Sequence, residues 1–106
     1  MAYLVRLTDR ALRDMESVYD FIEADESEKA FTWFRELAGT IYSLEQFPER
    51  GTRVPERGKL RELFFGEKPN TYRVIFAVDK RSRMVTVLHI RHGARAALPT
   101  EGTAET

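Results

Sequence analysis

Apolar residues follow two different periods along this chain, and the two periods predict two kinds of secondary structure. Residues 3–7 form a short apolar run that predicts a first strand. After Thr8 the apolar positions recur every three or four residues on both sides of the acidic break ADESE, which predicts two amphipathic helices. The apolar face of the first comprises Leu12, Met15, Val18, Tyr19 and Ile22, and that of the second comprises Ala30, Phe31, Phe34, Ala38, Ile41 and Leu44.

The ends of both helices carry capping and terminating residues. Thr8 is expected to cap the first helix, with Asp9 in its first turn, where a carboxylate suits the helix dipole. Ser27 is expected to cap the second helix, which Pro48 and Gly51 bring to an end. Two helices joined by a short turn form an antiparallel hairpin, and its apolar side needs a sheet to cover.

A period of two follows the helices. In residues 71–78, Tyr72, Val74, Phe76 and Val78 share one face, whereas Arg73, Ile75 and Ala77 share the other. Residues 60–65 and 84–90 predict the flanking strands, and the polar DKRSR predicts the second hairpin loop. The predicted fold is therefore α+β, with an N-terminal strand, an antiparallel helical hairpin and a three-stranded antiparallel meander.

Length and composition place these elements in one domain. The chain has 106 residues, of which 42% are hydrophobic, and we expect a single domain over residues 1–98 with a flexible tail at 99–106. The absence of cysteine excludes disulfides, thiolate metal sites and cysteine nucleophiles. No apolar run has the length of a membrane span or of a signal peptide, so a soluble cytoplasmic protein is expected.

The zero net charge conceals an asymmetry between two parts of the chain. Residues 57–95 contain ten basic and three acidic residues, whereas the rest contains seven basic and fourteen acidic ones. The acids of the first helix, including Asp14, are expected to form a solvated face. Together these distributions suit a protein with a basic working face and an acidic back.

The last predicted strand ends in the segment TVLHIRHGAR, residues 86–95, which gathers two histidines and two arginines around Gly93. We expect it to form, with Arg61 and Arg73, the rim of an anion-facing surface; the simpler alternative is a solvated strand end. His92 is the better candidate for proton transfer because it lies at the strand end and histidine titrates near neutral pH. His89, in mid-strand, is expected to be a packed or hydrogen-bonded sheet residue. No spacing of histidines or carboxylates indicates a metal site, and no cofactor is expected.

Five features in order give the chain a resemblance to a known family. They are the strand–helix–helix opening, FPERG after the second helix, GKLREL at 58–63, YRVIFAV at 72–78 and VLHIRHGAR at 87–95. Together they resemble the RelE/ParE superfamily of bacterial type II toxins, over nearly the whole chain to about Pro99. The resemblance implies a sheet with the helical hairpin on one face and a basic concave face on the other. It also implies inhibition by an antitoxin whose C-terminal segment wraps the toxin.

The superfamily divides by target, and the resemblance implies a role for particular arginines. RelE-like toxins cut messenger RNA in the ribosome without a metal ion, whereas ParE-like toxins act on DNA gyrase. Arg73 stands where RelE-like enzymes carry the arginine of their Tyr-Arg strand, and Arg95 matches a second arginine, with Arg91 as the alternative. Arginine suits phosphate because its planar fork binds it bidentately.

The rest of a RelE-like site is incomplete. Arg61 can stand for one member of the basic pair on the preceding strand, but Leu63 occupies the next position on the same face. The tyrosine that follows the second arginine in those enzymes is replaced by residues 96–98, AAL. This favours the ParE-like branch.

The sequence thus predicts one set of residues for the anion site or for catalysis: Arg73, Arg61, Arg95 and His92. A second set is predicted to bind a partner: Arg91, Lys59 and Trp33. Arg73 has an ion-pair alternative, and Trp33 could instead cover the edge of the core. The predicted function is a growth-arresting toxin of a plasmid-stabilisation type, aimed at gyrase and held by a cognate antitoxin. The alternatives are a metal-independent, ribosome-dependent messenger endoribonuclease and a non-toxic basic binding module.

Overall fold

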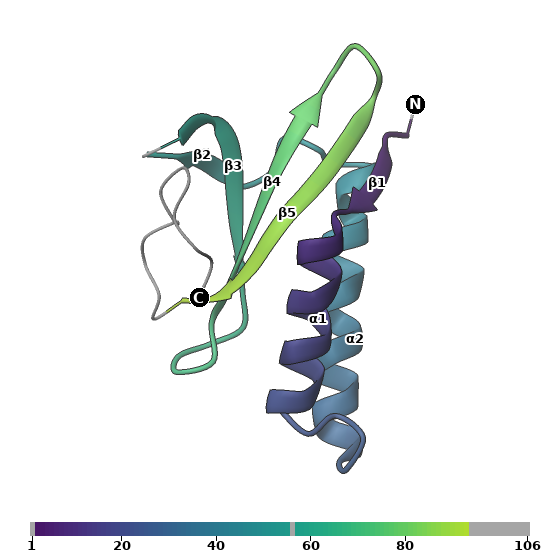
Figure 1. Ribbon diagram of the computed structural model, residues 1–106, viewed down its shortest axis with the longest axis vertical. Coiled ribbons are helices and arrows are strands. Elements are labelled where there is room, and N and C mark those ends of the chain that lie inside the picture. The colour runs from purple at the N-terminus through teal and green to yellow at the C-terminus, as the bar shows by residue number, and fades with distance from the viewer. Residues whose placement is uncertain (1, 56, 94–106) are drawn as a thin grey trace.

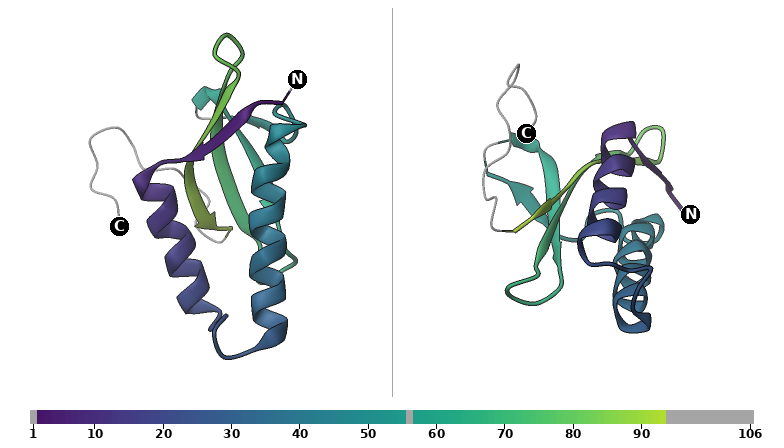
Figure 2. Two further views of the ribbon diagram at one scale, coloured as in Figure 1. Left: turned by 90° about the vertical axis from the view of Figure 1, so that its right-hand side faces the viewer. Right: turned by 60° about the horizontal axis from the view of Figure 1, so that its bottom comes forward.

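A five-stranded sheet with two helices on one face makes up the described part of the chain (Figures 1 and 2). The computed structural model describes residues 2–55 and 57–93. In chain order the elements are β1 (Leu4–Leu7), α1 (Asp9–Phe21), α2 (Glu28–Tyr42), the 3₁₀ turn η1 (Ser43–Glu45), β2 (Thr52–Val54), β3 (Arg57–Phe65), β4 (Tyr72–Asp79) and β5 (Met84–His92). The predicted order of strand, helical hairpin and antiparallel meander is confirmed, whereas the predicted tail at 99–106 lies outside the described residues.

Both helices begin at the predicted caps. The Thr8 hydroxyl accepts a hydrogen bond from the Ala11 amide at 3.0 Å, and the Ser27 hydroxyl accepts one from the Ala30 amide at 3.2 Å. Each bond satisfies an amide that the first helical turn leaves without a backbone partner, which is why both helices start there.

The sheet is larger than the predicted meander, because one strand joins it at each edge. The strand order is β1-β5-β4-β3-β2, with β1 parallel to β5 and every other pair antiparallel. The parallel pairing is possible because both helices lie between β1 and the rest of the sheet in sequence and carry the chain across its face. The strand pattern missed β2 because it has only three residues, of which Val54 alone is buried.

The main core lies between the helices and one face of the sheet. As predicted, Tyr72, Val74 and Phe76 turn toward the helices and are buried, and Val78 packs against their edge. The predicted stripe of α2 needs one correction, because Leu37 is fully buried and Phe31 is 43% exposed. At 3.6 residues per turn, Phe31 lies about 120° around the helix from Leu37, on the flank of the buried face.

A β-bulge in β5 decides which of its side chains face the core. Phe76 pairs with Val87 and Ile75 pairs with His89, so Leu88 is the extra residue between them. The bulge reverses the alternation of side chains along β5. Val87 and Ile90 consequently both face the helices, although an uninterrupted strand would place them on opposite faces.

Candidate functional site

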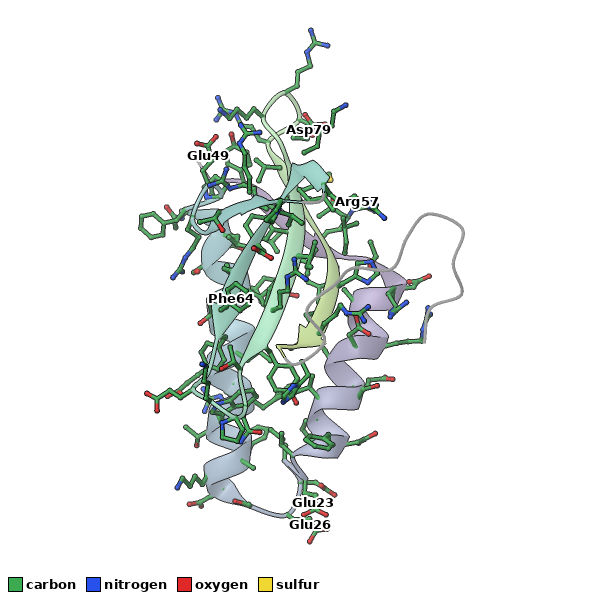
Figure 3. The ribbon with its side chains drawn as sticks, turned by 90° about the vertical axis from the view of Figure 1, so that its left-hand side faces the viewer. Glu23, Glu26, Glu49, Arg57, Phe64 and Asp79 are labelled. Atoms are coloured by element: carbon green, nitrogen blue, oxygen red, sulfur yellow. The ribbon has the colours of Figure 1, made fainter. Side chains whose placement is uncertain are left out.

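The sheet face turned away from the helices is the candidate site, and we call it the open face. The strand register places on it residues Leu60, Glu62 and Phe64 of β3, Arg73 and Ile75 of β4, and His89 and Arg91 of β5. Figure 3 views the molecule from this side and labels Phe64. Ile75 is nevertheless fully buried, because Val54 of β2 and Leu60 of β3 cover it in a second small apolar cluster.

Arg73 and Glu62 form an ion pair at the centre of the open face. Arg73 Nε donates to Glu62 Oε1 at 2.5 Å, and the two residues are only 5% and 8% exposed. They are diagonal neighbours on adjacent strands, since Glu62 pairs with Ile75 and Arg73 pairs with Phe64. Arg73 is thus held by a carboxylate, which is the ion-pair alternative that its sequence context also allowed.

An aromatic residue and a second arginine flank this pair. Phe64 lies opposite Arg73 on β3 and is 56% exposed, although it is a large apolar side chain in mid-strand. Arg91 pairs with Arg73 from the neighbouring strand β5 and shares its face, because the bulge shifts β5 by one residue. The open face therefore combines an exposed ring with a buried ion pair and a flanking arginine.

Arg61 does not join Arg73, and the predicted convergence of these two arginines is wrong. Arg61 pairs with Phe76, so it shares the face that packs against the helices, whereas Glu62 and Arg73 share the other. Its Nη2 donates to the carbonyl oxygens of Glu49 at 2.5 Å and Gly51 at 3.1 Å. The cause is the two-residue period of a strand, which separates neighbouring positions onto opposite faces.

His92 also lies on the helix side of the sheet. It pairs with Tyr72, and the two rings meet edge to face with centroids 5.1 Å apart. His92 lines a pocket of about 400 Å³ between α1 and the end of β5, together with Arg10, Asp14, Ser17, Val18, Phe21, Tyr72, Ile90 and Arg91. Burial raises the pKa of the Tyr72 hydroxyl above its ordinary value.

The remaining predicted residues are spread over the molecule. Trp33 is half-buried, and its ring packs edge-on against Phe65 and Tyr72, with centroids 5.2 and 5.6 Å away, at the edge of the core. Lys59 is exposed on β3 and lines a pocket with Arg61. Arg95 lies outside the described residues.

Asp14 has a structural role that the helical pattern did not indicate. Its Oδ2 accepts a hydrogen bond from the Ile90 amide at 3.0 Å, and its Oδ1 accepts one from Arg10 Nε at 3.1 Å. β1 pairs with β5 only as far as Val87, so the carboxylate of α1 satisfies an amide on the edge of β5 beyond the end of β1. Only the tertiary arrangement of α1 and β5 reveals this contact.

Two kinds of site are missing from residues 2–55 and 57–93. No group of three or more histidine, aspartate or glutamate side chains there could hold a metal ion. Within the same ranges, none of the helices combines the length and the apolar character needed to cross a membrane.

A known protein family matches most of this chain. The sequence model of the family described as "ParE toxin of type II toxin-antitoxin system, parDE" matches residues 5–97. A search of curated protein sequences finds no significant match.

Solved structures share the fold at low sequence identity. The toxin–antitoxin complex RelBE2 of Mycobacterium tuberculosis is similar at 21% identity and a TM-score of 0.65, over 87% of this chain and 99% of that one. The chromosomal ParDE system of P. aeruginosa gives 20% identity and a TM-score of 0.66, over 86% and 96% of the two chains. A mutant of the E. coli toxin RelE in the free state gives 13% identity and a TM-score of 0.64, over 91% and 88%.

Proposed function

This chain belongs to the ParE toxin family of type II toxin–antitoxin systems, and we propose that it arrests growth by acting on DNA gyrase and is neutralised by a cognate antitoxin. Gyrase acts in the bacterial cytoplasm, so the proposal places the protein there. The alternative within the superfamily is cleavage of messenger RNA in the ribosome. The buried ion pair between Arg73 and Glu62 is the observation that supports gyrase over cleavage.

Cleavage of RNA by attack of the 2′-hydroxyl needs positive charge on the phosphorane and groups that transfer protons. In this chain the guanidinium of Arg73 is buried and is held by the Glu62 carboxylate. A carboxylate in contact with the arginine opposes the approach of a phosphate to that arginine. The Arg73–Glu62 pair therefore suits a role in holding the sheet together better than a role in binding the scissile phosphate.

The composition of β3 also argues against cleavage. RelE-like toxins resemble this chain in the Tyr-Arg strand but carry a basic pair on the strand before it. The β3 residues that share the open face with Arg73 are Leu60, Glu62 and Phe64, none of which is basic. His92 and Arg61, which the sequence proposed as partners of Arg73, lie on the other face of the sheet. The open face therefore offers a protein-binding surface around Phe64 rather than a cluster of cations.

A cognate antitoxin is the expected partner. Similar solved structures include the RelBE2 complex of M. tuberculosis, the ParDE system of P. aeruginosa and the intact RelBE complex of E. coli. The charge asymmetry of this chain gives an acidic antitoxin segment a basic surface to approach. A titration of the chain with the product of the adjacent gene should show tight binding that weakens as salt is added.

The target is tested by two assays on the same protein. Purified chain added to gyrase, relaxed plasmid and ATP should inhibit supercoiling, and an equimolar amount of antitoxin should restore it. Primer extension on RNA from induced cells should give unbroken transcripts. Codon-phased cuts in the transcripts, or full supercoiling at a hundredfold molar excess of the chain, would reject the proposal. If induction leaves growth unchanged, the chain is a non-toxic binding module instead.

A further inference from the structure

A group of cations lines a separate pocket on the helix-side face of the sheet, beyond the C-terminal end of α2. This pocket has a volume of about 180 Å³, and we call it the basic pocket. It is lined by Glu49, Arg53, Gly58, Lys59, Arg61, Val78 and Lys80. None of these residues belongs to the open face. Figure 3 labels Glu49 at this end of the molecule, near the β4–β5 turn.

The two arginines of the basic pocket are held in place by backbone carbonyls. Arg53 Nη1 donates to the Gly58 carbonyl at 3.1 Å, and Arg61 Nη2 donates to the carbonyls of Glu49 and Gly51. A carbonyl oxygen orients a guanidinium but carries no net charge, so these two arginines keep their positive charge and are positioned before any ligand arrives.

Among the described residues that line the pocket, Glu49 is the only carboxylate. Glu49 Oε2 lies 2.7 Å from Lys80 Nζ, and the bond to Lys80 followed by the charges of Lys80, Arg61 and Arg53 lowers the pKa of Glu49. Counted over the described lining residues, four cations and one carboxylate leave an excess of three positive charges within one small concavity. Such an excess concentrates positive potential and attracts an anion of more than one charge.

We propose that the basic pocket binds the phosphate groups of a nucleic-acid backbone. Guanidinium groups donate two parallel hydrogen bonds to a phosphate, and the flanking ammonium groups add charge. Clusters of arginines also bind acidic peptides, but a phosphate matches the planar guanidinium fork and recurs along a nucleic-acid strand, whereas a peptide gains much of its affinity from apolar side-chain pockets. Val78 alone has an apolar side chain among the lining residues that the structure describes.

The neighbouring turn extends the same positive surface. Arg81 and Arg83 follow Lys80 in the β4–β5 turn and are exposed. The nearest acid in that turn, Asp79, already accepts hydrogen bonds from the amides of Arg81 and Ser82 through Oδ1. A nucleic-acid strand that enters the basic pocket can therefore continue along the turn. This binding site is additional to the proposed action on gyrase and does not depend on it.

Fluorescence anisotropy with a labelled single-stranded oligodeoxynucleotide tests the proposal. The variant with Lys59→Gln and Lys80→Gln removes two exposed charges from the pocket, and the control with Lys29→Gln and Arg35→Gln removes two exposed charges from α2. The pocket variant should bind roughly tenfold more weakly, and its salt slope should fall by about 1.4, since each lost phosphate contact on a single strand contributes about 0.7. The control should change affinity by less than about twofold.

Three results would overturn the proposal. The first is absence of binding by the unaltered chain at 50 mM salt, and the second is an equal loss of affinity in the pocket variant and the control. The third is displacement of the oligonucleotide, at constant ionic strength, by a smaller or different anion. Displacement by submillimolar inorganic phosphate would identify a free phosphate as the ligand, and displacement by polyglutamate of matched charge would identify an acidic peptide. Gyrase inhibition is measured on the same variants. A loss of oligonucleotide binding concerns the basic pocket, whereas a loss of gyrase inhibition concerns the proposed function, so the two failures can be told apart.

Discussion

Arg73 Nε and Glu62 Oε1 lie 2.5 Å apart on adjacent strands, in the middle of the open face, which lies on the side of the sheet away from α1 and α2. Two charged residues are rarely this inaccessible unless they are paired, and here each is less than a tenth exposed. The pair explains why an arginine matching the Tyr-Arg strand of RelE-like enzymes need not be a catalytic residue in this chain. Its strength can be measured by removing one partner.

Replacing Glu62 by alanine should destabilise the protein by about 3–5 kcal/mol, because it leaves the Arg73 guanidinium buried without its carboxylate. Urea denaturation monitored by tryptophan fluorescence measures the change. Replacing both partners, with Glu62→Leu and Arg73→Met, should recover most of the loss. A cost below about 1 kcal/mol for Glu62→Ala would show that the pair contributes little.

Gly51 should not tolerate a side chain. Its φ is +84°, and a Cβ at that position would collide with the Glu62 carbonyl oxygen. Gly51→Ala should therefore cost at least about 1–3 kcal/mol. Gly39 is the matched control, because it lies within α2 with open space around it, and Gly39→Ala should stabilise the chain by about 0.5–1 kcal/mol. Thermal unfolding of the two variants should shift in opposite directions.

Asp14 should protect the end of β5 from local opening. Its carboxylate accepts the Ile90 amide, and Asp14→Ala leaves that amide partly buried without its acceptor. The expected loss of stability is about 1–3 kcal/mol. Hydrogen exchange should accelerate at Ile90 in this variant. Asp20→Ala, an exposed substitution on the same helix, should leave the exchange of Ile90 unchanged.

The pKa of Glu49 should depend on Lys80. The hydrogen bond and the charge of Lys80 lower it from the ordinary 4.5, so the stabilisation from this group is present above pH 4.5 and is lost as the pH falls through the lower folded value. In Lys80→Gln the pKa of Glu49, measured by NMR titration of its carboxyl carbon, should rise toward 4.5. Asp79 is the internal control, because hydrogen bonds from Ser82 and Arg81 lower its pKa. An unchanged Glu49 titration would contradict the contact between the Glu49 carboxylate and Lys80.

Phe64 provides a test of the open face that leaves the fold intact. It is 56% exposed, so Phe64→Ala should change stability by less than about 0.5 kcal/mol. If the open face meets gyrase, the same variant should need at least tenfold more protein to inhibit supercoiling, as aromatic residues at interface centres often carry most of the binding energy. Phe21→Ala on α1, at an even more exposed aromatic, is the control and should inhibit normally. Equal inhibition by both variants would exclude Phe64 from the interface.

The candidate site was only partly predictable from the sequence. The face of β4 that carries Arg73 follows from strict alternation, and the ion-pair alternative was open from the start. The two strand faces were also apparent for β3, where Glu62 and Arg61 alternate. Which β3 face lies beside Arg73 depends on the pairing register, in which Glu62 pairs with Ile75. That register joins residues more than ten positions apart, and no local pattern encodes it.

The sequence by itself determined the local structure of this protein. Helical spacing and the hydroxyls of Thr8 and Ser27 set where α1 and α2 begin, and alternation set which residues of β4 enter the core. These features depend on interactions within a few residues, so they can be predicted from the sequence.

Only the tertiary structure decided how the charged residues are grouped. The bulge at Leu88 brings Arg91 beside Arg73, and the β3–β4 register sends Arg61 to the opposite face, where it lines the basic pocket with Lys59 and Lys80. The physical reason is that a shift of one residue moves a side chain to the other side of a sheet, and packing of the whole core selects the shift.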